Sequence, residues 1–346
     1  MKVLFIGGTG IISTEVTRLA VKKGMDVVLL NRGKHPRDIP DGVENILADI
    51  EDEADVCQKL AGRHFDAVID FIAFKPEQVA RDIRIFSGIC DQYVLISSAC
   101  VYRKPLTLFP ITEGTQIENA LWPYANDKIL CESVLTEAYH QNKFPMTIAR
   151  PTHTYSDVLL PVSLCGDCGS WSVAARMLAG KPVFVHGDGL SLWTVTHSRD
   201  VAKGIVGLLG NSHAIGEAVH ITSDEVVSWD DIYYAIGKAL GVTPKLLHVS
   251  TEMIAAFFPQ HYGHMMGDTA NCAIFDNTKI KRLVPDFAAT TRMDQGVCSS
   301  VKYHLAHPEL QKPDPQFDAV CDQMLKAYER FMRGGESPSE RDASAL

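Results

Sequence analysis

The amino-acid sequence predicts an α/β fold, a doubly wound parallel sheet followed by a smaller, mixed domain in the C-terminal part of the chain. Short apolar runs alternate with helical patterns in the first half, a glycine-rich turn follows the first apolar run, and the second half is less regular. Strands that alternate with helices form βαβ units, in which right-handed crossovers join parallel strands. We therefore expect the arrangement known as the Rossmann fold.

The predicted elements follow the chain in order. Apolar runs predict strands at residues 2–6, 26–30, 44–47, 67–72, 93–97 and 146–149. Helical spacing predicts helices at residues 11–23, 77–89 and 124–142. In the second half we expect a strand at 182–185 and helices at 200–209, 229–240 and 316–332.

These elements predict two domains and a tail. The sheet domain spans residues 1–160, and segments near 182–210 are expected to return to it. Residues 161–333 are expected to form a second domain that shapes the substrate site. The last stretch, 334–346, reads GGESPSERDASAL, a composition typical of a disordered tail.

Composition and charge narrow the classes of function. The chain has 346 residues and a formal net charge of −9, which argues against nucleic acid as the main partner because phosphate binding needs a basic surface. No apolar run is long enough for a membrane helix, and we expect residues 3–6 to be a buried strand rather than part of a signal peptide, which would need a longer apolar region and a cleavage site. The cysteine count of nine is odd, and most of these residues lie in apolar patterns, as reduced core thiols do. We therefore expect a cytoplasmic protein with no membrane partner.

A metal site is not expected. Cys165 and Cys168 form one C-x-x-C pair. A zinc site needs a second pair or suitably placed histidines, and neither is evident nearby.

The glycine-rich turn Gly7-Gly8-Thr9-Gly10 predicts a phosphate site. Gly7 and Gly10 allow a tight turn and close approach of the backbone to a pyrophosphate, and the following helix offers its N-terminal N–H groups. Ser13 takes the place of the usual third glycine and, being small, is expected to leave a slightly wider gap between helix and strand. A plain strand–helix turn is the alternative, but its place at the start of a βαβ pattern favours a dinucleotide.

The end of the second strand bears on the choice of dinucleotide. It reads Leu30-Asn31-Arg32-Gly33, with no carboxylate for a ribose 2′-hydroxyl and with an arginine that suits a 2′-phosphate. This favours NADP, with NAD still possible; the alternative is a solvated loop arginine. Asp49 is placed to meet the adenine edge, or else is a surface turn residue.

Tyr124 and Lys128 stand four residues apart at the start of a predicted helix, so they share one helical face. A nearby ammonium group lowers the pKa of a phenol, and Tyr124 could then act as a general acid or base at a substrate oxygen. Ser98 follows a buried strand, and strand ends of this kind face the ligand crevice. Taken alone, Tyr-x-x-x-Lys is more often a surface pair, and Ser98 could simply cap a loop.

Together these segments resemble the extended short-chain dehydrogenases/reductases, the group of nucleotide-sugar epimerases and dehydratases. The matching segments are GGTGIIS at 7–13, ADI at 48–50, DFIA at 70–73, SSACVY at 97–102, PITE at 110–113, PYANDK at 123–128, ARPTHTY at 149–155, HGDG at 186–189 and THSRDVA at 196–202. They run in family order over about residues 1–240.

The resemblance implies a set of functional residues. It implies catalysis by Ser98, Tyr124 and Lys128. It places the cofactor against Gly7, Gly10, Ile11, Ile12, Asp49, Ile50, Phe71, Ile72, Ala73, Pro151 and His153. From the residues themselves we also expect Asn31, Arg32 and Lys128 at the cofactor, and the substrate is expected against Ala99, His153, Trp171 and Trp193. It also implies a homodimer through the predicted helices at 77–89 and 124–142.

Departures from the family pattern restrict the substrate. Sugar 4,6-dehydratases carry an Asp-Glu pair where this chain has Ala99 and Cys100, so that activity is not expected. The family's diphosphate-contacting Arg–Asp pair corresponds here to Trp193 and Thr194, which puts diphosphate binding in doubt. Trp171 and Trp193 could form an aromatic platform for a sugar, or could be core residues.

Two histidines, His261 and His264, are expected in a loop near the substrate mouth rather than at a metal. Ser13 and the Asn-Arg-Gly segment at 31–33 also resemble atypical family members, some of them relatives of a plastid RNA-binding protein.

Taken together, the motifs favour an NAD(P)-dependent oxidoreductase or epimerase acting on a secondary hydroxyl of a sugar or nucleotide-sugar-like substrate. The alternative is a non-catalytic dinucleotide-sensing or RNA-associated protein.

Overall fold

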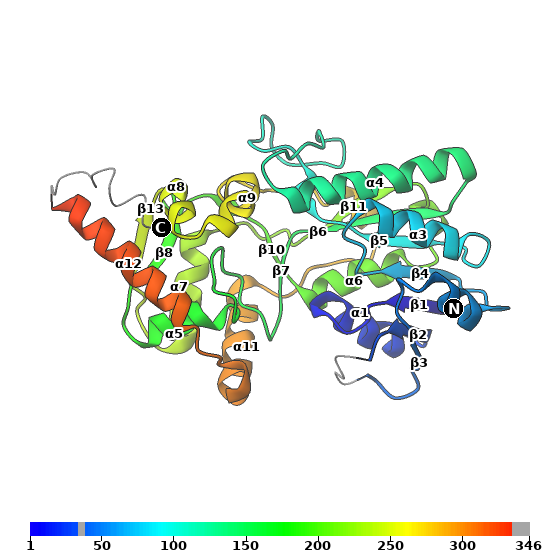
Figure 1. The fold of residues 1–346 in the computed structure, drawn as a ribbon, viewed down its shortest axis with the longest axis horizontal. Helices are drawn as coiled ribbons and strands as arrows, with labels where there is room; N and C mark the ends of the chain where they lie inside the picture. Colours follow the sequence, from blue (N-terminus) through cyan, green and yellow to red (C-terminus); the bar gives the residue numbers. More distant parts are fainter. Residues whose placement is uncertain (34–38, 334–346) are drawn as a thin grey trace.

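The computed structural model describes residues 1–33 and 39–333, so the predicted tail lies outside the described residues. Seven strands form one sheet in the order β11-β6-β5-β4-β1-β2-β3, and every neighbouring pair is parallel. The strands are β1 (Lys2–Ile6), β2 (Asp26–Asn31), β3 (Glu44–Leu47), β4 (Ala67–Asp70), β5 (Tyr93–Ile96), β6 (Met146–Pro151) and β11 (Ala218–Ile221). The predicted Rossmann sheet is confirmed (Figure 1).

Helices cover both faces of this sheet. One face carries α1 (Ile11–Lys22) and α6 (Ser198–Leu208), which pack against each other; the other carries α2 (Glu53–Leu60), α3 (Pro76–Phe86) and α4 (Pro123–Asn142). Figure 1 shows the two helical layers on either side of the strands. In β1, Val3 and Phe5 belong to the core under α1 and α6, whereas Leu4 and Ile6 belong to the core under α3 and α4. Burial on both faces explains why β1 is a continuous apolar run.

Two predicted elements end earlier than expected, for local reasons. β4 stops at Asp70 instead of residue 72, because the Asp70 carboxylate accepts hydrogen bonds from the N–H groups of Ile72 and Ala73 and turns the chain. α3 stops at Phe86 instead of residue 89, since Gly88 adopts a φ of 78° that a helix does not allow. α2 and β11 were not predicted.

The remaining elements form a second body, seen at the left of Figure 1. Its strands are β7 (His153–Tyr155), β8 (Val183–His186), β9 (Leu192–Trp193), β10 (Val195–His197), β12 (Val227–Ser228) and β13 (Leu246–Val249), paired as β10-β7, β12-β9 and β13-β8. Its helices are α5 (Trp171–Leu178), α7 (Trp229–Leu240), α8 (Thr251–Phe257), α9 (Tyr262–His264), α10 (Thr278–Leu283), α11 (Met293–Ala306) and α12 (Pro315–Met332). α10 is the exception within this group, because it contacts β11 and α6 of the sheet domain.

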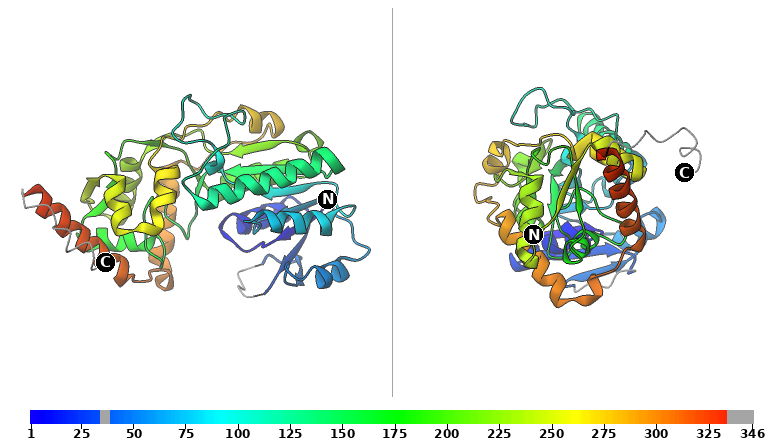
Figure 2. Two further views of the ribbon diagram at one scale, coloured as in Figure 1. Left: turned by 45° about the horizontal axis from the view of Figure 1, so that its top comes forward. Right: turned by 90° about the vertical axis from the view of Figure 1, so that its left-hand side faces the viewer.

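The stretch 182–210 divides between the two bodies. α6 returns to the sheet domain and packs on α1, whereas β8 pairs with β13 outside the large sheet. The strand that does extend the sheet is β11, which lies beside β6. The chain therefore crosses between the bodies several times, as the side view in Figure 2 shows.

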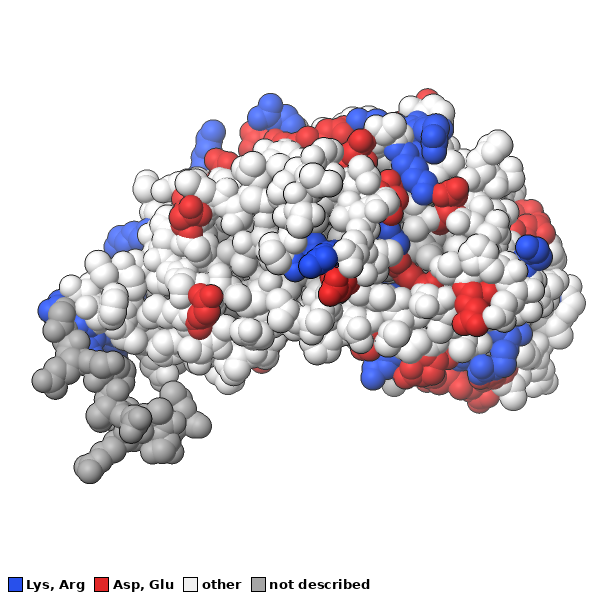
Figure 3. Space-filling model, turned by 90° about the horizontal axis from the view of Figure 1, so that it is seen from above, with Lys and Arg blue, Asp and Glu red and all other residues white. Residues whose placement is uncertain are grey.

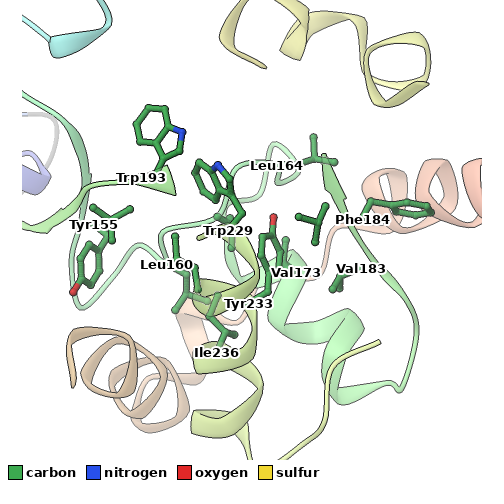
Figure 4. Packing of buried hydrophobic residues seen from close by; sticks show 14 of the residues in the cluster. Tyr155, Leu160, Leu164, Val173, Val183, Phe184, Trp193, Trp229, Tyr233 and Ile236 are labelled. Carbon is green, nitrogen blue, oxygen red and sulfur yellow. The ribbon is translucent and has the colours of Figure 1, made fainter. Parts of the chain in front are cut away.

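The second body has its own apolar core. Trp193 and Trp229 lie with ring centroids 5.5 Å apart, above Tyr233 and Ile236 on α7 (Figure 4).

All nine cysteines are unpaired. Within the described part of the chain no helix is long and apolar enough to cross a membrane. In the same residues no three His, Cys, Asp or Glu side chains are grouped as metal ligands would be.

Candidate active site

A cavity of about 520 Å³ opens at the carboxyl ends of β1 and β2 and is lined by the glycine-rich turn. Gly7 adopts a φ of 81°, and a Cβ atom there would stand 2.4 Å from the Ile72 side chain, so only glycine fits. The turn leads into α1, which has no acidic residue in its first turn. Free N–H groups and the positive end of the helix dipole at this point suit a pyrophosphate. The cavity has the size and the donors that a dinucleotide needs.

Ser13 closes this turn in a way that the sequence did not indicate. Its buried hydroxyl donates to the carbonyl of Gly7 at 2.9 Å and accepts from the N–H of Gly10 at 2.7 Å. The serine in the usual glycine position thus fixes the two glycines relative to the start of α1. It also occupies the Gly10 N–H, so the cofactor phosphates would depend on the other N–H groups at the start of α1.

The residues predicted from the end of β2 line the same cavity. Asn31 accepts a hydrogen bond from the Gly33 N–H and donates to Asn45, which fixes its side chain. Arg32 is 55 % exposed, and its guanidinium lies 3.9 Å from the Asp49 carboxylate, a weak contact in water. Arg32 therefore remains available to a ligand in the cavity.

The lining also includes Ile50 and Ile72 among the predicted cofactor residues, and Glu51, Phe74 and Gln78, which were not predicted. Seven predicted cofactor residues lie outside it: Lys128, Pro151 and His153, which are described below, and four others. Ile11 and Ile12 begin α1, Phe71 packs edge-on against Phe5 with ring centroids 6.0 Å apart, and Ala73 is fully buried.

A second cavity, of about 240 Å³, lies at the carboxyl end of β5 and brings Ser98 and Tyr124 together. Ser98 precedes a short 3₁₀ turn, η1 (Ala99–Val101), and Tyr124 stands in the first turn of α4, which Pro123 starts. Burial raises the pKa of Tyr124, and a hydrogen bond with Ser98 opposes the shift. Tyr124 is therefore a neutral phenol that can donate its proton.

The structure shows the contacts of Lys128, whose predicted role beside Tyr124 stays a prediction. Its side chain is 1 % exposed, and its ammonium donates at 2.8 Å to the carbonyls of both Ala73 and Ile96. It lies 5.9 Å from the centre of the Tyr124 ring and lines neither cavity. In this structure Lys128 ties the loop after β4 to the end of β5, so it positions the two strand ends.

Phe74 connects the two cavities. It lines the dinucleotide pocket, and its ring lies 6.3 Å from the ring of Tyr124, which lines the second cavity. A dinucleotide that extends past Phe74 would reach Tyr124. The arrangement allows one ligand to occupy the first cavity and react with a second ligand beside Tyr124.

Of the predicted substrate residues, Ala99, His153 and Trp193 line the second cavity, whereas Trp171 does not. Trp171 is 4 % exposed and stacks on His304 with ring centroids 5.1 Å apart, so the core alternative holds for it. Trp193 lines the cavity although it is also mostly buried. Pro151 ends β6 and lines neither cavity.

Several lining residues come from segments that are distant in sequence. Trp122, Thr152, Asp268 and Phe275 were not predicted. His264 was expected near the substrate mouth, and it lines the cavity with its ring against Trp122. His261 does not line it. The four-residue spacing of His264 and Asp268 is a signal that both share a helical face, but nothing in the spacing shows which cavity they face.

The class of protein follows from where the two cavities lie, since both open at the carboxyl ends of a Rossmann sheet, as in the extended short-chain dehydrogenases/reductases. The chain matches the NAD dependent epimerase/dehydratase family over residues 3–222 and belongs to that family. It is thus an NAD(P)-dependent enzyme of the short-chain type.

Individual relatives include both reductases and epimerases. The chain is 27 % identical to 2′-dehydrokanamycin reductase of Streptomyces kanamyceticus, with 83 % of this chain and 80 % of the relative covered. It is 30 % identical to the chloroplast stem-loop binding protein of 41 kDa b of Arabidopsis thaliana, with 72 % and 66 % covered. Its fold is similar to that of UDP-glucuronic acid 4-epimerase from Bacillus cereus in complex with UDP-glucuronic acid and NAD, with a TM-score of 0.70, 18 % identity, and 88 % and 99 % covered.

Proposed function

We propose that the enzyme is an oxidoreductase or epimerase that acts on a secondary hydroxyl of a sugar-like substrate by Tyr-assisted hydride transfer. The observation that carries the proposal is the meeting of Ser98 and Tyr124 in one cavity, with the Tyr124 ring 6.3 Å from that of Phe74, which lines the dinucleotide pocket. The relatives named for a dehydrokanamycin and for UDP-glucuronic acid support a sugar ring as the substrate.

Each side chain has a role that its position allows. A bound dinucleotide supplies or accepts a hydride at its nicotinamide ring. Neutral Tyr124 gives its proton to a substrate carbonyl oxygen as the hydride arrives, and in the reverse direction the ionised phenolate takes the proton of the substrate hydroxyl; Ser98 holds that oxygen by a hydrogen bond. Lys128 holds the loop after β4 and the end of β5 together, because its ammonium donates to the carbonyls of Ala73 and Ile96.

Replacing Tyr124 by Phe tests the proposal. Loss of the proton-transferring group is expected to lower kcat by about 10²- to 10⁴-fold with little change in dinucleotide affinity. Tyr139→Phe, a change on the same helix away from both cavities, serves as the control and is expected to retain activity. Unchanged turnover in Tyr124→Phe would remove Tyr124 from the mechanism, and dinucleotide binding without any turnover in the native chain would favour a sensing role.

We further propose NADP as the preferred dinucleotide, because no carboxylate ends β2 and Arg32 lines the pocket. Arg32→Ala is expected to weaken NADP binding by about 10- to 100-fold, since a charge-assisted contact is lost, and NAD binding by much less. Arg18→Ala, an exposed change on α1, is the control. Calorimetric titration with both dinucleotides measures the difference, and equal losses would refute the 2′-phosphate role.

The purified enzyme also distinguishes an epimerase from a dehydrogenase and shows whether the chain forms a homodimer. An epimerase retains its dinucleotide through purification, whereas a dehydrogenase exchanges it readily. The homodimer through α3 and α4 stays a prediction; in the single chain these helices pack against each other, and sedimentation would give the mass of the assembly.

A further inference from the structure

One segment of the second body forms a wall of the cavity around Tyr124. α9 (Tyr262–His264) continues into a π-helical turn, η4 (Met265–Thr269), so that His264 and Asp268 both line the cavity. Single π-helical turns occur frequently at functional sites. Two glycines allow this wall to approach the start of α4: a Cβ atom on Gly263 would stand 2.9 Å from the Leu121 carbonyl oxygen, and one on Gly267 would stand 2.9 Å from the Asn119 side chain.

The two imidazoles in the lining of the cavity are neutral. Burial lowers the pKa of His153 and of His264 to about 4, so both imidazoles are uncharged near pH 7. Neither ring forms a hydrogen bond with another residue in the described ranges. Each neutral imidazole therefore offers the cavity one donor and one acceptor, which is the pattern that hydroxyl groups require.

The aromatic part of the lining suits the flat face of a ring. Trp122 lies 4.9 Å from Tyr124 and 5.1 Å from His264, measured between ring centroids. Trp193 also lines the cavity, edge-on to His153 at 6.1 Å. Sugar rings pack on such surfaces through their C–H faces while their hydroxyls reach polar groups at the edge.

The charges of the cavity do not suit phosphate. Among the described residues that line it there is no Lys or Arg, and Asp268 adds a carboxylate. The ammonium of Lys104 lies 3.3 Å from this carboxylate and 5.2 Å from the Trp193 ring centre, and its side chain is 2 % exposed. A diphosphate needs positive charge or several free N–H donors. The charged groups that it would meet here are a carboxylate and an ammonium that is already paired with it.

From these observations we propose that the cavity binds a hydroxyl-rich ring without phosphate, and that His153 and His264 recognise its hydroxyl groups. The inference rests on the proposed function and narrows its substrate to free sugars, cyclitols and their glycosides. Nucleotide sugars are excluded from this class.

The test uses the full chain with saturating dinucleotide. UDP-glucose and UDP-galactose are compared with glucose, galactose and myo-inositol as hydride donors, by the absorbance of reduced nicotinamide, and UDP and UDP-glucose are titrated calorimetrically. His264→Phe keeps a ring against Trp122 and removes both nitrogens. His264→Asn retains polar groups in case the first variant does not fold, and His261→Phe is the matched control on the same segment.

We expect oxidation of at least one phosphate-free compound, no binding of UDP or UDP-glucose at about 1 mM, and a KM that rises about tenfold in His264→Phe with a small change in kcat. The control should keep the native KM. Tight binding or turnover of a UDP-sugar, with the phosphate-free compounds inactive or His264→Phe without effect, would overturn the inference and leave the proposed function intact. No hydride transfer from either class would overturn the proposed function, and the inference with it.

Discussion

The ion pair between Arg150 and Glu132 offers the sharpest test of how the reactive strand ends are held. Arg150, near the end of β6, donates from Nε to Glu132 at 2.9 Å and from Nη2 at 2.6 Å. Its third nitrogen donates to the Tyr102 hydroxyl at 3.0 Å, and Ser97 donates to the same carboxylate. Glu132 therefore joins α4 to the ends of β5 and β6.

The expected cost of Glu132→Gln follows from burial. Both side chains are at most 6 % exposed, so water cannot compensate a lost charge. The amide keeps the shape of the carboxylate but leaves the guanidinium without its counter-charge. Removing one partner of a buried pair costs about 3–5 kcal/mol, a large fraction of the ~5–15 kcal/mol that stabilises a typical domain.

Urea unfolding of the native chain and of the variant, followed by circular dichroism, measures this loss. Glu137→Gln on the exposed face of α4 is the control, and its free energy of unfolding should change by less than about 0.5 kcal/mol. A loss below about 1 kcal/mol in Glu132→Gln would show that the pair contributes no more than an exposed one, and the reasoning from burial would be wrong.

Two further predictions concern the wall of the cavity and acid stability. Gly267→Ala is expected to lower kcat/KM and to cost about 1–3 kcal/mol of stability, because the new methyl group would press on Asn119, which three hydrogen bonds hold in place. Gly114→Ala, whose methyl group would meet nothing closer than 3.6 Å, should be neutral, and a similar loss in both would refute the packing argument. The free energy of unfolding should fall as the pH drops from about 6.5 to about 4, since burial lowers the pKa of His153, His186 and His264 to about 4 and the unfolded chain binds protons that the folded chain excludes. Each histidine accounts for up to about 3 kcal/mol of this loss. Urea unfolding at several pH values measures how steeply the free energy of unfolding depends on pH, and this dependence should be shallower in His186→Gln. A free energy of unfolding that does not change over this range would contradict the lowered pKa values of these histidines.

Local patterns in the sequence were sufficient for six of the seven strands of the large sheet. The first six strands were predicted within two residues at each end, because strands buried on both faces are continuous apolar runs and their helices are amphipathic. The glycine-rich turn and the Tyr-x-x-x-Lys spacing are equally local, so Gly7, Ser98 and Tyr124 could be named from short segments. β11 was not predicted, since its partner β6 lies about 70 residues earlier and four residues carry little periodicity.

Only the tertiary structure decided what surrounds Tyr124. His264 and Asp268 reach the cavity because Gly263 and Gly267 let a distant segment pack against the start of α4, a contact that no local pattern encodes. The same packing separates Trp193, which lines the cavity, from Trp171, which the core covers. It also directs the Lys128 ammonium toward two carbonyls instead of toward Tyr124. Sequence spacing fixes which side chains share a face of one element, whereas burial and partners depend on the elements that pack against that face.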